Sequence, residues 1–197
     1  MLTIRKYCRK DRTAVQDICV ETSWLKDNDT PTNRTMLTSL YSDYYTDFTD
    51  NTFVAEQEGE VTVYILACDD HADFSRKMRS LYLPLVRKLS FRQYISQKRT
   101  VRFWNKTALS GVVHMHIDIT EKCQRQGVGR KLLYALARHL ESKKVHTVML
   151  LCSTENVKGC NFYKKYGFTE HSEHWGCTLF VVTLSKLLAN CKPDVVQ

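Results

Sequence analysis

The chain has 197 residues, of which 43% are hydrophobic and 25% are charged, and its formal net charge is +8. This is the composition of an ordinary folded protein, with enough residues for one domain with its own core. No apolar run approaches the roughly 20 residues of a membrane-spanning helix, and the N-terminus lacks the apolar stretch of a secretion signal. We therefore expect a cytoplasmic or nuclear protein that is not secreted and has no membrane partner.

The first third of the chain predicts strands and helices in turn. Residues 2–7 alternate apolar and polar side chains, which predicts a strand. Apolar residues at helical spacing predict helices over residues 11–24 and 32–48. Residues 52–56 and 61–68 are apolar runs around a glycine-bearing loop, so they predict a β-hairpin.

Residues 69–110 are too many for an unstructured connection inside a compact domain. Their apolar spacing predicts one helix that is interrupted at Pro84 and a second helix over residues 91–105. Charge is also segregated here. Residues 74–117 contain ten Lys or Arg and no acid, whereas residues 17–60 contain ten acids and two bases.

The remaining elements complete a mixed α/β order. The predicted strands and helices are, in order, strand 111–119, helix 127–142, strand 147–152, helix 156–166, strand 169–174 and strand 177–183. Gly167 fits a helix end in the left-handed conformation. The eight cysteines form no C-x-x-C pair, so we predict free thiols in a reducing compartment and neither a disulfide framework nor a zinc site.

The most informative stretch, residues 117–133, reads IDITEKCQRQGVGRKLL. An apolar strand leads into Gln124-x-x-Gly127-x-Gly129 and then directly into an amphipathic helix. The first N–H groups of a helix have no intrahelical acceptor, and the helix dipole adds partial positive charge there. Glycine at 127 and 129 removes Cβ, so a phosphate can approach the backbone closely. The Walker and dinucleotide patterns are both absent.

A second motif follows downstream, where residues 156–168 read NVKGCNFYKKYGF. The two stretches together resemble motif A (Gln/Arg-x-x-Gly-x-Gly/Ala) and motif B (Asn, a helix, then Phe-Tyr-x-x-x-Gly-Phe) of the GNAT superfamily of N-acetyltransferases. The resemblance implies a single domain over residues 1–197, with a mixed, mostly antiparallel central sheet and helices on both faces. Residues 69–110 fall outside it and are identified as a basic helical insertion between the third and fourth strands.

The resemblance implies that acetyl-CoA is the co-substrate, with no metal. The acetyl group would move directly to a primary amine, of a small molecule or of a protein or peptide, in a ternary complex. The backbone of Ile117 and Ile119 would hold pantetheine and the acetyl carbonyl. Asn156 would contact pantetheine, and the alternative is that it only caps the short helix. The residues implied for the pyrophosphate are Gln124, Arg125, Gln126, Gly127, Val128, Gly129 and Arg130.

Tyr163 matches the family tyrosine near the CoA sulfur, where a phenol can protonate the departing thiolate and contact the cofactor. The alternative is a core tyrosine with a satisfied hydroxyl. His114, His116 and Asp118 share one face of the strand 113–119. The His-x-His pair resembles that of arylalkylamine acetyltransferases, although it lies one residue nearer Gly127 here.

Our ranking for the general base is His116, then Asp118, then His114, because a free imidazole has a pKa near 6.5. A buried polar network and a metal site are the alternatives for these three residues. The acids and tyrosines of the second helix would attract a cationic amine, or would form a solvated acidic face. That set is Asp43, Tyr44, Tyr45, Asp47 and Asp50.

Several interpretations of the charged segments stay open. The acidic and basic segments could neutralise each other, or could form an acidic substrate lip that faces a basic lid. The bases of residues 69–110 could bind CoA phosphates, dock an acidic protein or nucleic acid, or form a solvated helix face. A nucleic-acid partner is the least favoured of these.

Two functions compete with catalysis. One is a catalytically silent CoA-binding regulatory or interaction protein, and the other is a nucleic-acid-binding module. The identity of the amine acceptor and the oligomeric state do not follow from the sequence.

Overall fold

The computed structural model describes residues 2–192 and contains one seven-stranded sheet in the order β1-β2-β3-β4-β5-β7-β6. Neighbouring strands are antiparallel except β4 and β5, which are parallel. The strands are β1 Leu2–Lys6, β2 Phe53–Gln57, β3 Glu60–Cys68, β4 Val113–Ile119, β5 Thr147–Ser153, β6 Thr169–His174 and β7 Cys177–Thr183. The predicted mixed, mostly antiparallel α/β fold is therefore confirmed.

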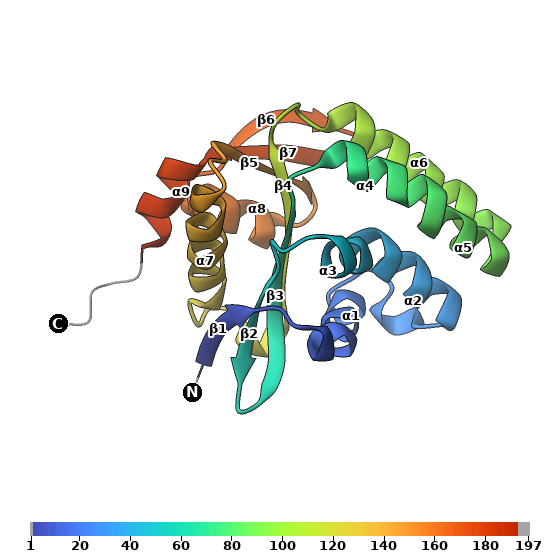
Figure 1. The fold of residues 1–197 in the computed structure, drawn as a ribbon, viewed down its shortest axis with the longest axis horizontal. Helices are drawn as coiled ribbons and strands as arrows, with labels where there is room; N and C mark the ends of the chain where they lie inside the picture. Colours follow the sequence, from blue (N-terminus) through green and yellow to red (C-terminus); the bar gives the residue numbers. More distant parts are fainter. Residues whose placement is uncertain (1, 193–197) are drawn as a thin grey trace.

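The sheet separates two layers of helices (Figure 1). On one side lie α7 (Val128–Ser142), α8 (Val157–Lys165) and α9 (Leu184–Cys191). On the other side lie α1 (Arg12–Glu21), α2 (Pro31–Thr38) and α3 (Tyr44–Phe48), together with α4 (His71–Lys77), α5 (Leu83–Leu89) and α6 (Phe91–Thr107). Within residues 2–192 none of the helices is long and apolar enough to cross a lipid bilayer.

Strand β3 shows why both faces of the sheet are buried. Val63, Ile65 and Ala67 pack in the core that contains α7, and the alternate residues Tyr64 and Leu66 pack in the core that contains α1 and α3. Successive side chains of a strand point to opposite faces, so an almost continuous apolar run serves two cores. The same alternation sends the polar side chains of β4 to the α1 side and its Met and Ile side chains to the α7 side.

The sheet splits between β4 and β5. Strands β4 and β5 pair only at Val113 with Val148 and at His114 with Met149. Beyond His114, the edge of β4 that faces β5 has no strand partner among the described residues. A cofactor or substrate can therefore lie between the two strands without displacing a sheet hydrogen bond.

Two helical segments contain π turns that the sequence pattern did not predict. The predicted helix 32–48 is α2 and α3 joined by the π turn Ser39–Asp43. The predicted interruption at Pro84 is wrong, because residues 71–89 stay helical through the π turn Met78–Tyr82. The N–H of Leu83 donates to the carbonyl of Met78 in the wider π pattern, and Pro84 follows in the first turn of α5, where a missing N–H is tolerated.

Helix α9 was also not predicted. Its Leu184, Leu187 and Cys191 are buried in the core and recur at helical spacing, so the signal was present in a short segment after the last strand. All eight cysteines are free thiols, as predicted.

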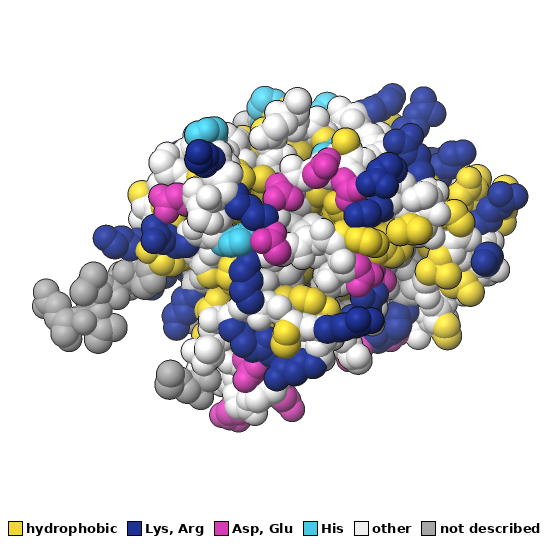
Figure 2. All heavy atoms as spheres, in the orientation of Figure 1, with side chains coloured by type: hydrophobic (Ala, Val, Ile, Leu, Met, Phe, Trp, Pro, Cys, Tyr) yellow, Lys and Arg dark blue, Asp and Glu magenta, His cyan; other side chains and the backbone are white. Residues whose placement is uncertain are grey.

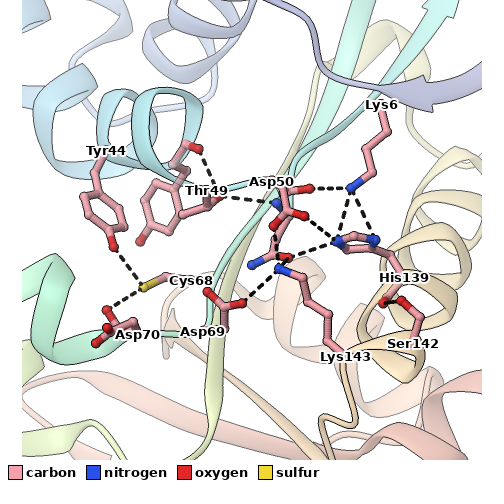
Figure 3. Close-up of polar contacts among 12 residues, drawn as sticks. Lys6, Tyr44, Thr49, Asp50, Cys68, Asp69, Asp70, His139, Ser142 and Lys143 are labelled. Atoms are coloured by element: carbon pink, nitrogen blue, oxygen red, sulfur yellow. Dashed lines mark hydrogen bonds and ion pairs between the residues drawn. The ribbon is translucent and has the colours of Figure 1, made fainter.

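A polar network holds the C-terminal end of α7 to the sheet (Figure 3). The Lys143 ammonium contacts the carboxylates of Asp50 and Asp69 and, at 2.8 Å, the side-chain oxygen of Asn51. His139 lies 3.1 Å from the same Asn51 oxygen. The hydrogen bond from Lys143 lowers the pKa of Asp50. Burial acts to raise the pKa of Asp69, but hydrogen bonds from Asn51 and Lys143 outweigh it and lower that pKa.

Replacing Lys143 with Met is expected to lower the free energy of unfolding by about 0.5–1 kcal/mol at pH 7, because the network is partly exposed and screened. The two carboxylates have lowered folded-state pKa values. Their stabilisation is therefore present above the unfolded pKa of about 3.9 and is lost as the pH falls through the folded values. Urea unfolding at pH 7 and pH 3 measures this, with Lys144→Met as the matched control. Equal stabilities of the two variants at pH 7 would contradict the assignment.

Candidate active site

A cavity of about 240 Å³ lies in the gap between β4 and β5. One wall comes from the end of α1 and the turn after it, through Thr22, Ser23 and Trp24. Tyr41, in the π turn between α2 and α3, forms a second part of that wall. The remaining walls come from β4, from β5 and from the start and middle of α8. The cavity thus joins residues of β4 and α8, which carry parts of the two sequence motifs, to residues of the first helices.

The three polar residues of β4 divide between two environments. His116 and Asp118 line the large cavity, and the Tyr64 hydroxyl donates a hydrogen bond to the Asp118 carboxylate. His114 lies deeper, outside this cavity, and its Nε2 is 2.5 Å from the hydroxyl of Tyr45. The structure therefore brings His116 and Asp118 to the cavity but not His114.

Burial sets the protonation states of these groups. It raises the pKa of Asp118 to about 6, against the hydrogen bonds from Tyr64 and Thr22, which lower it. Burial lowers the pKa of His116 to about 4. Burial also lowers the pKa of His114, and the nearby His116 and His71 lower it further. Near neutral pH, Asp118 is therefore the strongest base that faces the cavity, ahead of the imidazole that ranked first from the sequence.

A second, smaller cavity of about 30 Å³ lies beside the histidines. His71, His114 and His116 line it, and each has one buried ring nitrogen without a hydrogen-bond partner among the described residues. A space of this size suits a single water molecule that bridges polar groups. Within residues 2–192 no group of three His, Cys, Asp or Glu side chains is arranged to hold a metal ion.

Tyr163 faces the large cavity from α8. Its ring packs against Phe168 and Phe180, at centroid distances of 5.6 and 5.7 Å. Its hydroxyl makes no hydrogen bond to any residue that the structure describes. Burial, followed by the neighbouring Cys152 and Asp118, raises the pKa of Tyr163, so the phenol keeps its proton throughout the neutral range. A protonated, unpartnered hydroxyl is available to a ligand.

Asn156 has a structural role as well as a place in the cavity wall. Its side-chain oxygen accepts a 2.9 Å hydrogen bond from the N–H of Gly159 and so caps the N-terminus of α8. Its side chain also lines the cavity. The capping alternative is therefore correct, and contact with a ligand remains a prediction.

The turn before α7 presents free backbone donors. Gly127 is the N-cap of α7 and has a φ of +75°, in the left-handed region that glycine favours. The N–H groups of Arg125, Gln126, Gly127, Val128 and Gly129 donate to no acceptor within the described part of the chain. The side-chain amide of Gln124 instead donates to the carbonyl of Ile119 at the end of β4, and that of Gln126 donates to the carbonyl of Lys122. The main chain of this turn is thus free to bind an anion.

The two glycines of this turn serve different ends. At Gly127 a Cβ would meet nothing within 4 Å, which agrees with open access from solvent. At Gly129 a Cβ would lie 2.7 Å from the ring of Phe162 and 2.8 Å from Ile119. Glycine at 129 therefore lets α7 pack closely on β4 and α8, in addition to any effect on ligand approach.

Replacing Gly129 with Ala is expected to lower the free energy of unfolding by about 1–3 kcal/mol, the usual cost of overpacking a core. The matched control is Gly127→Asn, because asparagine tolerates the left-handed conformation and meets open space. Chemical denaturation of both variants measures the difference. A Gly129→Ala protein as stable as the native one would show that Phe162 moves aside without cost.

The set of acids and tyrosines named from the second predicted helix, Asp43, Tyr44, Tyr45, Asp47 and Asp50, does not line the cavity. Arg12 pairs with Asp43 and Asp47, and Lys143 pairs with Asp50. These acids are neutralised by bases outside residues 69–110, so the two oppositely charged segments do not neutralise each other through ion pairs among the described residues. These five residues therefore do not form part of the cavity wall, and their attraction of a cationic amine stays a prediction. The part of the cavity wall on the α1 side of the sheet is instead formed by residues that no sequence motif marks, namely Cys19, Thr22, Ser23, Trp24, Leu37 and Tyr41.

Residues 69–110 fold onto the α1 side of the sheet. Phe74, Met78 and Trp104 are buried in the core there, and Lys and Arg side chains gather on the outer surface of these helices (Figure 2). Helix α6 leads into the start of β4, whereas the turn before α7 follows the end of β4. The length of the strand thus separates the basic segment from the glycine turn, which argues against the interpretation that these bases cover CoA phosphates.

Comparison with known proteins identifies the family of this chain. The pattern of the acetyltransferase (GNAT) family matches residues 20–168. No curated protein matches the chain by sequence. The crystal structure of a protein named SsHAT superposes with a TM-score of 0.83 at 22% identity, covering 93% of this chain and 98% of that one.

Two further structures share the fold. The ribosomal-protein-S18-alanine N-acetyltransferase of Escherichia coli has a TM-score of 0.56 at 17% identity, with 93% of this chain and 94% of that chain covered. The PaiA N-acetyltransferase of Thermoplasma acidophilum, solved with coenzyme A, has a TM-score of 0.62 at 12% identity, with 93% and 99% covered. Because the family pattern spans well over half of the chain, the chain belongs to the acetyltransferase (GNAT) family and is an acyltransferase that uses acetyl-CoA.

Proposed function

We propose that this protein transfers an acetyl group from acetyl-CoA to a primary amine, of a small molecule or of a protein or peptide, directly within a ternary complex. The observation that carries the proposal is the cavity in the split between β4 and β5, which has Asp118 on one wall and Tyr163 on another. In this proposal residues 1–197 form one domain, with residues 69–110 as a helical insertion.

The residues present fit acetyl-CoA. The free N–H groups from Arg125 to Gly129 would hold the pyrophosphate, with Gln124 and Arg130 at the ends of that turn. The edge of β4 at Ile117 and Ile119, which does not pair with β5, would hold pantetheine, with Asn156 in the wall of the same cavity. When bound there, acetyl-CoA supplies the acetyl group as a thioester.

Asp118 would act as the general base, which reverses its order with His116 in our ranking from the sequence. An amine arrives as an ammonium ion and must lose a proton before its nitrogen can attack. A carboxylate with a pKa of about 6 is ionised at neutral pH and accepts that proton. His116, beside Asp118 on the same face, and His114 behind it would pass the proton away from the cavity.

Tyr163 would act as the general acid. As the nitrogen–carbon bond forms and the carbon–sulfur bond breaks, its hydroxyl would give a proton to the sulfur, and a second proton from the amine nitrogen would restore the phenol. A direct transfer is supported by Cys152, which lines the same cavity. Burial raises the pKa of Cys152 to about 12, so this thiol is not the thiolate that an acetyl-enzyme intermediate needs.

Calorimetry with acetyl-CoA, combined with a free-CoA release assay over a panel of amines and peptides, tests the proposal. We expect saturable acetyl-CoA binding and amine-dependent release of CoA. Tight binding without release on any amine would instead favour the catalytically silent CoA-binding protein. No binding of acetyl-CoA would reject both.

A further inference from the structure

We infer that the acceptor is a small cationic primary amine with an apolar or aromatic body and no carboxylate beside its amino group. This inference rests on the proposed function, whose acceptor class it narrows. It follows from the charge and the surface chemistry of the cavity that holds Asp118 and Tyr163.

The lining of the cavity carries one formal charge, and that charge is negative. Asp118 is its one carboxylate, and no Lys or Arg side chain lines it anywhere in the described chain. His116, the other titratable base in the wall, is neutral at pH 7 because burial lowers its pKa to about 4. An ammonium group therefore finds an oppositely charged partner here, whereas a carboxylate would be repelled by Asp118 and would find no cation to offset the cost of leaving water.

The acceptor side of the cavity is aromatic. The ring of Tyr41 meets Trp24 edge-to-face at 5.9 Å and meets His116 edge-to-face at 5.5 Å. Leu37 lines the same cavity. Aromatic faces attract a cation and also pack against an apolar body. The wall thus suits both the ammonium group and the apolar body of such an amine.

The mouth of the cavity sets the size of the acceptor. Trp24 is 69% exposed and stands at the rim, beside Thr22 and Ser23. The cavity of about 240 Å³ must also admit the acetyl end of the cofactor. The space left therefore favours a small acceptor.

The direct test compares the binding of amines that lack a carboxylate with the binding of an amino acid. Calorimetric titrations in the presence of CoA would compare phenethylamine, phenylalanine and phenylalaninamide. We expect phenethylamine and the amide to bind within about tenfold of each other, and phenylalanine at least 100-fold more weakly. Equal binding of phenylalanine and phenethylamine, or no binding of phenethylamine, would overturn the inference.

A substitution at Ser23 tests separately whether charge in the cavity is what excludes a carboxylate. Ser23→Arg places a cation beside the cavity, and Ser23→Met has a long side chain without the charge. We expect Ser23→Arg to raise the affinity for phenylalanine relative to phenethylamine at least tenfold, and Ser23→Met to leave that ratio near the native one. An unchanged ratio in Ser23→Arg would count against the inference.

Because these titrations measure binding, they remain informative if the chemistry fails. Turnover with phenethylamine but not with phenylalanine would support both the function and the acceptor class. Selective binding of phenethylamine without any release of CoA would reject the proposed function and leave the inferred ligand class standing.

Discussion

Asp118→Asn is expected to lower kcat/KM for an amine substrate by about 100- to 10,000-fold, the range over which a positioned base contributes. The amide has nearly the same shape but cannot accept the ammonium proton. The affinity for acetyl-CoA should change little, because the glycine turn before α7 lies beyond the end of β4. Steady-state turnover and calorimetry measure the two quantities. Asp27→Asn, the same change at an exposed position outside the cavity, is the control.

The pH profile of the native enzyme tests the same residue. Only the ionised carboxylate accepts a proton, so kcat/KM should fall as the pH drops through about 6, the raised pKa of Asp118. Tyr64→Phe removes a hydrogen bond that lowers this pKa, so the fall should begin at higher pH in that variant. A profile that is unchanged in both Tyr64→Phe and Asp118→Asn would show that another group is the base.

The parts of this site that the sequence predicted are local. The glycine turn before α7, the alternation along β4 and the capped helix α8 each depend on residues within a few positions of one another. Gly127 needs its left-handed φ whatever packs against it. The faces of β4 follow from the period of a strand alone.

The parts that the sequence did not predict depend on tertiary contacts. One wall of the cavity joins the turn after α1 to Tyr41, and Tyr41 lies in a π turn. No local sequence pattern predicts this π turn, and none predicts the π turn before Pro84. The ranking of the candidate general bases also depends on tertiary structure. Burial lowers the pKa of His116 and raises that of Asp118.

Gly129 combines a feature that the sequence predicted with a tertiary contact that it did not predict. Its place in the motif was clear from the sequence, and its contact with Phe162 and Ile119 was not. A glycine in a phosphate-binding motif can thus be required by helix packing as well as by the ligand. Loss of cofactor binding in a Gly129 variant would need the denaturation measurement described above before it could be assigned to the phosphate.

Tyr163→Phe is expected to lower kcat by about 100- to 1,000-fold while the dissociation constant for acetyl-CoA stays within about twofold. The ring contacts with Phe168 and Phe180 remain in the variant, so the fold and the cavity wall are kept. Only the hydroxyl, which has no partner among the described residues, is removed. The departing thiolate would then have to take its proton from water.

The matched control is Tyr166→Phe, the same change three residues further along, on a tyrosine that is buried outside the cavity. Turnover of that variant should stay near the native value. The acid role also predicts a dependence on the leaving group, because a thioester whose thiol is more acidic needs less protonation. Tyr163→Phe should therefore lose much less activity with such a thioester than with acetyl-CoA. An equal loss with both donors would assign Tyr163 to positioning instead of proton transfer.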